Sequence, residues 1–393
     1  MPRSYNALMA NALRPDVCIR GAGIVGRTLA LLLARERLRV ALVQPPPAAG
    51  AVSASGHGDV RAYALNRASR QLLDGLRVWP ELTEATPVAS MDVHGDGEGS
   101  ARGALHFSAA EIGTDALAWI VDVPALERLL ADAVRYQPLI ECVEQPVQAV
   151  LTVVCEGRDS RTRAEFGVDY ETFGYGQHAI ATRMACERAH DGVARQWFLG
   201  GAGDGSRGDV LALLPLGGPL GRSVAVVWSA APERARELTA LDDAAFAQTL
   251  QAACGDALGS LQCIAPRATW PLQLSRARQW VGEGWALAGD AAHAVHPLAG
   301  QGLNLGLADA ECLARTLHER EYFRGIGERR LLRRYERARQ LDVGAMTLVT
   351  DGLQRLFSAP GSWTQDLRNR GLSAFDRSGP LKQWFGRQAM GST

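Results

Sequence analysis

The apolar positions near the start of the chain predict a strand, a loop, a helix and a second strand, in that order. Residues 16–20 form a short apolar run, a glycine-rich segment follows, and a helical pattern continues to about Arg37. A second apolar run, 38–43, ends at Gln44 and three consecutive prolines, which stop a strand. This order is typical of a βαβ unit at the beginning of an α/β fold.

A different pattern occupies the middle of the chain. Helices are expected at 66–76 and 124–134, and short alternating apolar runs between 170 and 270 predict an antiparallel sheet. One helix, over about 242–253, interrupts this sheet. The α/β pattern resumes at Gly284, and helices predominate from Leu303 to the end. The pattern therefore predicts a Rossmann-like nucleotide-binding domain that is interrupted by an antiparallel β-sheet domain and followed by C-terminal helices.

Composition narrows the class of protein. The 393 residues exceed the usual size of one domain, and 47% of them are hydrophobic, which is ample for a packed core. A net charge of zero argues against a nucleic-acid partner bound through counterion release. The seven cysteines contain no C-x-x-C pair, which favours buried free thiols in a reducing compartment. No apolar stretch has transmembrane length and residues 1–14 lack a secretion signal, so we expect a cytoplasmic protein; a peripheral contact at the inner membrane stays open.

The first glycine-rich segment has the spacing G-x-G-x-x-G. Gly21 permits a tight turn, Gly23 lets the backbone approach a pyrophosphate, and Gly26 allows the following helix to pack closely on the strand. The helix N-terminus adds free N–H donors and partial positive charge for the phosphates. Because the segment directly follows an apolar strand, it predicts a bound dinucleotide.

Gln44 departs from this pattern. The second strand of such a unit usually ends in Asp or Glu, which accepts hydrogen bonds from the adenosine ribose. The amide oxygen of Gln44 can accept one such bond without a carboxylate's charge. We interpret it as a neutral substitute that weakens affinity, and a nucleotide with a 2′-phosphate is the alternative.

A second motif follows the strand expected at 285–288. An Asp at position 290 can accept hydrogen bonds from a polyhydroxylated chain such as ribitol, and a proline with two glycines then lets the backbone pass close to a flat ring. The helix that begins there would direct positive charge at the N1–C2 oxygen region of a reduced flavin. A second contact so far along the chain predicts an extended FAD. The residues of this segment expected to bind it are Gly289, Asp290, Pro297, Gly300, Gln301, Gly302, Leu303 and Asn304.

Two other kinds of chemistry have little support. His293 and His296 have a spacing that metal ligands use, but no Cys, Asp or Glu ligand set accompanies them, so we expect hydrogen-bonded histidines and no metal site. The chain contains no G-x-S-x-G elbow, which argues against a serine hydrolase.

With these two motifs the chain resembles the class A flavoprotein aromatic hydroxylases, and among them the ubiquinone-biosynthesis hydroxylases. Residues 59–65 are similar to the family's D-x-R-x-x-A-L segment, which implies that Arg61 lies by the flavin. Residues 155–163 are similar to the family's middle motif, which is associated with flavin and reduced-nicotinamide contacts. The resemblance continues through residues 168–170, 213–216, 227–228, 350–353, 356–357 and 367–372.

Four departures from the family pattern predict weaker FAD binding. Gln44 replaces the expected acid, and Glu156 replaces an aspartate of the middle motif with a longer arm. Val123 stands where the family usually offers Asn or Gln to the flavin. The segment 142–154 is shorter than expected, by what corresponds to a pair of strands.

The resemblance implies an FAD-dependent monooxygenase that hydroxylates a prenylated phenol in ubiquinone biosynthesis. NAD(P)H would reduce the flavin, and O2 would then form the C4a-hydroperoxide that attacks the ring. No catalytic side chain is assigned, because the flavin carries the difficult step. A biosynthetic complex or a peripheral membrane contact are the partners that such a substrate implies. Two alternatives stay open, namely a flavin oxidoreductase without oxygen insertion and a degenerate, non-catalytic subunit of a biosynthetic complex.

The same reading divides the chain into six ranges. Three are expected to build the FAD-binding domain, two the substrate sheet, and one the C-terminal helices. The FAD-binding ranges are 15–85, 121–169 and 276–345; the substrate-sheet ranges are 86–120 and 170–275; the helical range is 346–393.

Overall fold

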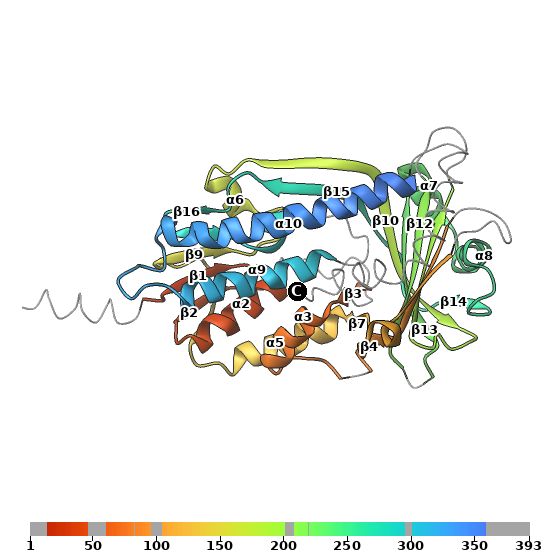
Figure 1. Ribbon diagram of the computed structural model, residues 1–393, viewed down its shortest axis with the longest axis horizontal. Coiled ribbons are helices and arrows are strands. Elements are labelled where there is room, and N and C mark those ends of the chain that lie inside the picture. Colours follow the sequence, from red (N-terminus) through yellow and green to blue (C-terminus); the bar gives the residue numbers. More distant parts are fainter. Residues whose placement is uncertain are drawn as a thin grey trace, which may run out of the picture.

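The computed structural model describes residues 14–45, 60–81, 83–95, 104–200, 208–218, 220–294 and 301–358. These residues form three sheets, with helices packed on and between them (Figure 1). The expected α/β fold is confirmed. No helix of the described ranges is long and apolar enough to cross a bilayer.

A six-stranded sheet lies at one end of the molecule (Figure 1). Its order is β16-β17-β9-β1-β2-β8, and all neighbours run parallel except β16 and β17. The strands of this sheet are β1 (Val17–Arg20), β2 (Val40–Val43), β8 (Ile140–Val143), β9 (Leu151–Val154), β16 (Val281–Gly282) and β17 (Trp285–Leu287). Parallel strands are covered on both faces, which explains the continuous apolar runs of the sequence.

Helices from three parts of the chain surround this sheet. Helix α2 (Ile24–Arg35) connects β1 to β2, so the predicted βαβ unit is confirmed, and it packs against α5 (Val123–Arg135) and α9 (Gln301–His318). Helix α10 (Arg329–Ser358) packs on α9. The expected helices beyond α10 lie outside the described residues.

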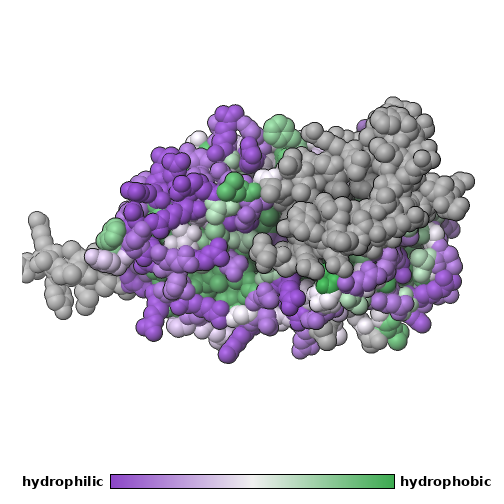
Figure 2. Space-filling view, in the orientation of Figure 1, coloured by the Kyte–Doolittle hydropathy of each residue, from purple (hydrophilic) through white to green (hydrophobic). Residues whose placement is uncertain are grey.

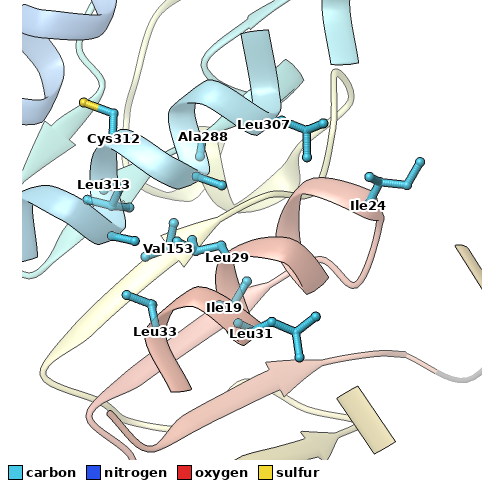
Figure 3. Close-up of a cluster of buried hydrophobic side chains, with 14 of the residues drawn as sticks. Ile19, Ile24, Leu29, Leu31, Leu33, Val153, Ala288, Leu307, Cys312 and Leu313 are labelled. Carbon is cyan, nitrogen blue, oxygen red and sulfur yellow. The ribbon is translucent and has the colours of Figure 1, made fainter. Parts of the chain in front are cut away.

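A continuous apolar core joins sheet and helices (Figure 3). Ile19 of β1, Val153 of β9 and Leu29 of α2 meet Leu307 and Leu313 of α9 within it. Each of these five side chains is fully buried. Because the core combines segments from both ends of the chain, the second motif is carried to the first.

The nine-stranded sheet forms the other end of the molecule (Figure 1). Its order is β18-β15-β10-β13-β12-β11-β5-β6, with β14 also paired to β10, and only β11 and β5 run parallel. The strands of this sheet are β5 (Ser90–His94), β6 (Ala104–Ser108), β10 (Tyr170–Cys186), β11 (Val193–Leu199), β12 (Asp209–Leu216), β13 (Ser223–Ala230), β14 (Leu261–Cys263), β15 (Ala268–Ala277) and β18 (His293–Ala294).

Two expectations for this sheet were wrong. The strands are not uniformly short, because β10 has 17 residues and continues past a register shift between Gly174 and His178. Two helices, not one, interrupt the sheet, namely α7 (Pro232–Ala240) and α8 (Asp243–Cys254). In α7 only Ala235 and Leu238 are buried, so its sequence has too few apolar positions to reveal a helix.

A small third sheet was not anticipated. The antiparallel strands β3 (Ala62–Leu65), β7 (Ala118–Asp122) and β4 (Ala85–Val88) pair in that order, next to α3 (Arg67–Gly75). Two further short helices complete the fold, α4 (Ala109–Ile112) and α6 (Arg161–Glu165).

The expectation of buried thiols holds for part of the set. All seven cysteines are free, and four of them are buried, but Cys142 on the edge strand β8 is exposed. Strand β8 lies at the edge of its sheet, where fewer neighbouring elements cover the side chains. The prediction that Cys142 is buried was therefore wrong.

Candidate active site

The three glycines of the first loop serve two different purposes. A Cβ on Gly21 would lie 2.4 Å from the carbonyl oxygen of Cys155, and one on Gly26 would lie 1.9 Å from the carbonyl oxygen of Gly21. Both positions are therefore closed to any side chain. A Cβ on Gly23 would meet nothing within 4 Å, and Gly23 is the N-cap of α2. The N-terminus of α2 is thus open to an anionic ligand.

Gln44 lies beside this loop. It directly follows β2, whose last residue Val43 pairs with Arg20 at the end of β1. Its backbone N–H donates to the carbonyl of Val143 (2.8 Å), and its side chain is exposed. The parallel strands bring Gln44 to the edge of the sheet at which the glycine loop begins.

The second motif meets the first at Val25, in the first turn of α2. A Cβ on Gly289 would lie 3.4 Å from the methyl carbons of Val25, and one on Gly306 of α9 would lie 2.7 Å from Val25 Cγ2. Gly306, which the sequence reading missed, lets α9 approach α2 closely. The signal for it in the sequence was a glycine inside an amphipathic helix. Glycine lowers the stability of a helix, so its presence there indicates that another segment packs closely at that position.

The backbone around Asp290 is fixed at three points. The N–H of Gly289, whose φ is +63°, donates to Asp309 Oδ2 (2.9 Å). The carbonyl of Asp290 accepts from the hydroxyl of Tyr170 (2.8 Å), and that of Ala291 accepts from Arg163 Nη1 (3.2 Å). The Asp290 side chain is exposed. These three hydrogen bonds use only backbone groups of residues 289–291, so they leave the Asp290 carboxylate available to a ligand.

Charges from other motifs act on the Asp290 carboxylate. Solvent reaches it on one side while protein surrounds it elsewhere, and the resulting desolvation raises its pKa. Interactions with His293, Arg158 and Arg61 oppose this rise in pKa, and the nearby Asp309 carboxylate adds to it. Two residues predicted from separate motifs, Arg61 and Asp290, are thus close enough to interact electrostatically.

Arg61 directly precedes β3, and its segment is held by the nine-stranded sheet. Arg183 of β10 donates from Nε to the carbonyl of Val60 (3.4 Å) and forms an ion pair with Asp122, the last residue of β7. This contact connects the two sheets next to Arg61.

The middle motif supports the second motif. Glu156 accepts from Ser160 Oγ (2.7 Å), from the Thr162 N–H (3.1 Å) and from Thr162 Oγ1 (2.5 Å), all at the start of α6. Burial alone would raise the pKa of Glu156, but these bonds and the nearby Arg20 lower it. The longer arm of Glu156 therefore still anchors α6, from which Arg163 reaches the second motif.

Two other departures have plain structural descriptions. Val123 is the first residue of α5 and is buried in the core, where it offers no side-chain hydrogen bond. Residues 144–150 link β8 to β9 without a helix or strand of their own. Their effects on FAD affinity stay predictions.

Asn304 is bonded within the protein. Its Oδ1 accepts from the N–H of Asn66 (3.0 Å) and from Ser69 Oγ (2.7 Å), and its Nδ2 donates to the carbonyl of Ala64 (2.9 Å). The side chain thus connects α9 to β3 and α3. A cofactor contact from Asn304 would therefore have to come from its backbone.

The remaining predicted residues differ in how far they are described. Leu303 is largely buried in the core, and a Cβ on Gly302 would meet nothing within 4 Å. Gln301 begins α9, so Gly302 lies within the first turn rather than before the helix. Pro297 and Gly300 lie outside the described residues.

His293 and Asp309 form the buried centre of the second motif. His293 Nε2 lies 2.7 Å from Asp309 Oδ2, and its ring stacks on Trp280 with centroids 4.9 Å apart. His293 Nδ1 has no hydrogen-bond partner among the residues that the structure describes. His296 lies outside the described residues, and within the described ranges no group of three His, Cys, Asp or Glu could hold a metal.

Asp309 was missed by the sequence reading. Its carboxylate is fully buried and also accepts from Arg339 Nε of α10 (2.7 Å, to Oδ1). Burial alone would raise the pKa of Asp309, but His293 and Arg339 outweigh it and lower the pKa. An acidic residue on the apolar side of α9 was the only signal in the sequence.

The residues present fit an extended dinucleotide. The N-terminus of α2 is open at Gly23, the first turn of α9 is open at Gly302, and the exposed Asp290 carboxylate lies near Arg61. The site therefore offers donors for phosphates and an acceptor for hydroxyl groups.

Comparisons with known proteins agree with this geometry. A family model described as FAD binding domain matches residues 140–349. The ubiquinone hydroxylase UbiL of Rhodospirillum rubrum is 33% identical over 401 residues, which cover 96% of this chain and 90% of that protein. The 3-demethoxyubiquinol 3-hydroxylase of Escherichia coli is 30% identical over 400 residues, which cover 96% of this chain and 98% of that protein.

Solved structures show the same fold. The p-nitrophenol 4-monooxygenase PnpA of Pseudomonas putida has a TM-score of 0.72 at 17% identity, covering 96% of this chain and 98% of that chain. PqsL of Pseudomonas aeruginosa has a TM-score of 0.72 at 21% identity, covering 92% of this chain and 100% of that chain. The fold and the site define a class A FAD-dependent aromatic hydroxylase. The chain belongs to the family of the ubiquinone-biosynthesis hydroxylases and is an FAD-dependent monooxygenase.

Proposed function

We propose that this enzyme hydroxylates a prenylated aromatic precursor of ubiquinone, with FAD as cofactor and NAD(P)H and O2 as cosubstrates. The observation that carries the proposal is the position of Asp290. Three hydrogen bonds fix the backbone of residues 289–291, Asp290 itself is exposed, and Gly289 packs on the first turn of α2, whose N-terminus is open. Full-length relatives named as ubiquinone hydroxylases support the substrate class.

We infer the cofactor contacts from this geometry. The loop at Gly21, Gly23 and Gly26 would bind the pyrophosphate through the N-terminus of α2, and Gln44 would bind the adenosine ribose. Asp290 would accept from ribitol hydroxyls. Bound FAD would supply the hydride acceptor and the means of oxygen activation.

The protein's own task near the ring is charge placement and close packing. The first turn of α9, with Gln301, Gly302, Leu303 and Asn304, would direct backbone N–H groups at the flavin, and Arg61 would lie on its other side. Pro297 and Gly300 stay predicted contacts from the sequence.

The proposed substrate site is the region between the nine-stranded sheet and the FAD-binding part. Strand membership supports the six-range division of the chain only in part. Strand β18 joins the nine-stranded sheet from within the range 276–345, and the three-stranded sheet combines strands from both sides of the boundaries at 85/86 and 120/121. A prenylated substrate is strongly apolar, so delivery from a membrane surface or from a partner enzyme belongs to the same proposal.

The first experiment measures flavin in the purified protein by visible absorption and then titrates it with FAD. Asp290→Ala should raise the FAD Kd about tenfold, since it removes one charged hydrogen-bond acceptor. Because desolvation already disfavours the charged Asp290 carboxylate in the folded protein, the apoprotein of this variant should be no less stable than wild type. A wild-type protein that fails to bind saturating FAD overturns the proposal and favours a non-catalytic subunit.

The second experiment tests the reaction itself. A prenylated phenol incubated with the FAD-loaded enzyme, NAD(P)H and isotope-labelled O2 should yield a product that contains one labelled oxygen atom. Cofactor oxidation without label in the organic product identifies an oxidoreductase that does not insert oxygen.

A further inference from the structure

The Asp309 carboxylate connects three elements. Its Oδ2 accepts from the Gly289 N–H (2.9 Å) and lies 2.7 Å from His293 Nε2, so one oxygen binds residues on both sides of Asp290. Its Oδ1 accepts from Arg339 Nε (2.7 Å). Asp309 is thereby bonded at once to the second motif and to α10.

One face of α10 is directed at the same motif. The Tyr335 hydroxyl donates to the carbonyl of Leu287, at the end of β17 (2.8 Å). Glu336 Oε1 accepts from the N–H of Trp280 (2.8 Å), whose ring stacks on His293. With Arg339, these residues are spaced so that they share one side of the helix. Helix α10 therefore contacts the second motif in three ways: through Leu287, which precedes the motif, through Trp280, which stacks on His293, and through Asp309.

The opposite side of α10 faces solvent. Five arginines of α10 are exposed, namely Arg329, Arg330, Arg333, Arg334 and Arg337. Hydrophilic side chains predominate on the surface over the first turns of α10 (Figure 2). Arg339, in contrast, is only 5% exposed, and it also donates to the carbonyl of Leu305 (3.3 Å). A buried arginine requires partner charges, and Arg339 has two: the buried Asp309 and the exposed Asp342, whose Oδ2 lies 2.7 Å from Arg339 Nη1.

We propose that Asp309 and Arg339 are positioning residues, through which the docking of α10 sets the direction of the Asp290 carboxylate and hence the affinity for FAD. The inference rests on the proposed role of Asp290 as a cofactor ligand. Removal of Arg339 takes the arginine's charge away from the fully buried Asp309, and removal of the Asp309 charge leaves Arg339 with Asp342 at the surface. Either change therefore loosens the support of the Gly289 turn. A supporting contact of this kind controls how rigidly a binding group is presented.

The test measures the FAD Kd by flavin fluorescence, together with urea unfolding of the apoprotein, for Asp309→Asn, Arg339→Met and the double variant. We expect each single variant to raise the Kd about tenfold. The double variant should raise it by much less than the product of the two, because the residues act as a pair. The visible circular dichroism of bound flavin should change in the single variants.

Asp209→Asn is the matched control. Asp209 is a largely enclosed carboxylate that accepts from Trp228 Nε1 (3.0 Å) in the nine-stranded sheet, so its loss should affect unfolding without changing the FAD Kd. Should Asp309→Asn fail to fold, Arg339→Lys keeps the charge and should raise the Kd less than Arg339→Met does.

The outcomes separate this inference from the proposed function. Wild-type protein that binds FAD, with variants that unfold more easily but bind FAD as tightly as wild type, overturns the positioning role alone. The positioning role is also overturned if Arg339→Lys and Arg339→Met both bind FAD with the Kd of wild type. Wild-type protein that does not bind FAD overturns the proposed function instead.

Discussion

The two segments predicted to bind FAD are held in different ways. The glycine loop is held by close backbone packing, since Gly26 touches Gly21 and Gly21 touches Cys155. The segment around Asp290 is held by polar side chains from α6, β10 and α9, with a buried ion pair behind it. The first arrangement leaves no room for an added atom at Gly21 or Gly26. The second depends on several separate side-chain hydrogen bonds, so it can be weakened one bond at a time.

The strongest test of this comparison is Gly26→Ala. Its Cβ would lie 1.9 Å from a backbone oxygen, so we expect the free energy of unfolding to fall by at least about 3 kcal/mol and FAD binding to disappear. Urea unfolding and FAD titration measure the two effects. Gly23→Ala is the control, because its Cβ meets only open space, and it should weaken FAD binding without destabilising the apoprotein. A stable Gly26→Ala protein would contradict the packing argument.

Glu156→Ala tests the polar support of the second segment. Loss of the carboxylate removes three acceptor bonds at the start of α6 and should cost about 1–2 kcal/mol, as removal of a helix cap does. Because α6 carries Arg163, the FAD Kd should rise as well. Glu156→Gln retains an acceptor oxygen and should show a smaller effect in the same assays. Equal Kd values for Ala, Gln and wild type would separate α6 from the cofactor site.

Acid should weaken the second segment before the first. The pKa values of Asp309 and Glu156 are both lowered in the folded protein, so their contribution to stability is complete above the ordinary carboxyl pKa of about 4 and is lost as the pH falls through the lower folded values. Unfolding of the apoprotein, followed from about pH 6 to pH 3, should show this loss. Arg339→Met should lessen the pH dependence, and an unchanged profile would count against the buried pair.

The smallest expected effect is that of Gly302→Ala. Gly302 lies in the first turn of α9 with open space at its Cβ, so alanine should stabilise the apoprotein by about 0.5–1 kcal/mol. The same methyl group would meet a flavin that packs on this turn, and FAD binding should weaken. A gain in thermal stability with unchanged FAD affinity would show that the cofactor does not approach Gly302.

Much of the fold was predictable because its signals are local. The strand, loop and helix at 16–37 follow from one apolar run, one glycine spacing and one periodic helix, and α5 and α8 from their amphipathic patterns. Helix α7 was missed because its sequence is mostly polar, and the length of β10 because glycines interrupt its apolar pattern. The three-stranded sheet could not be predicted, since its strands come from distant parts of the chain.

The sequence by itself determined the class of cofactor and predicted the residues that bind it, because a phosphate-binding turn and an exposed carboxylate require particular residue types at fixed spacings. Only the tertiary structure decided which polar residues support that site. It turned Asn304 inward to β3 and α3, and it joined Asp309 to Arg339 across two helices. The physical reason is that a buried charge is stable only beside its partner, and packing of the whole core selects that partner.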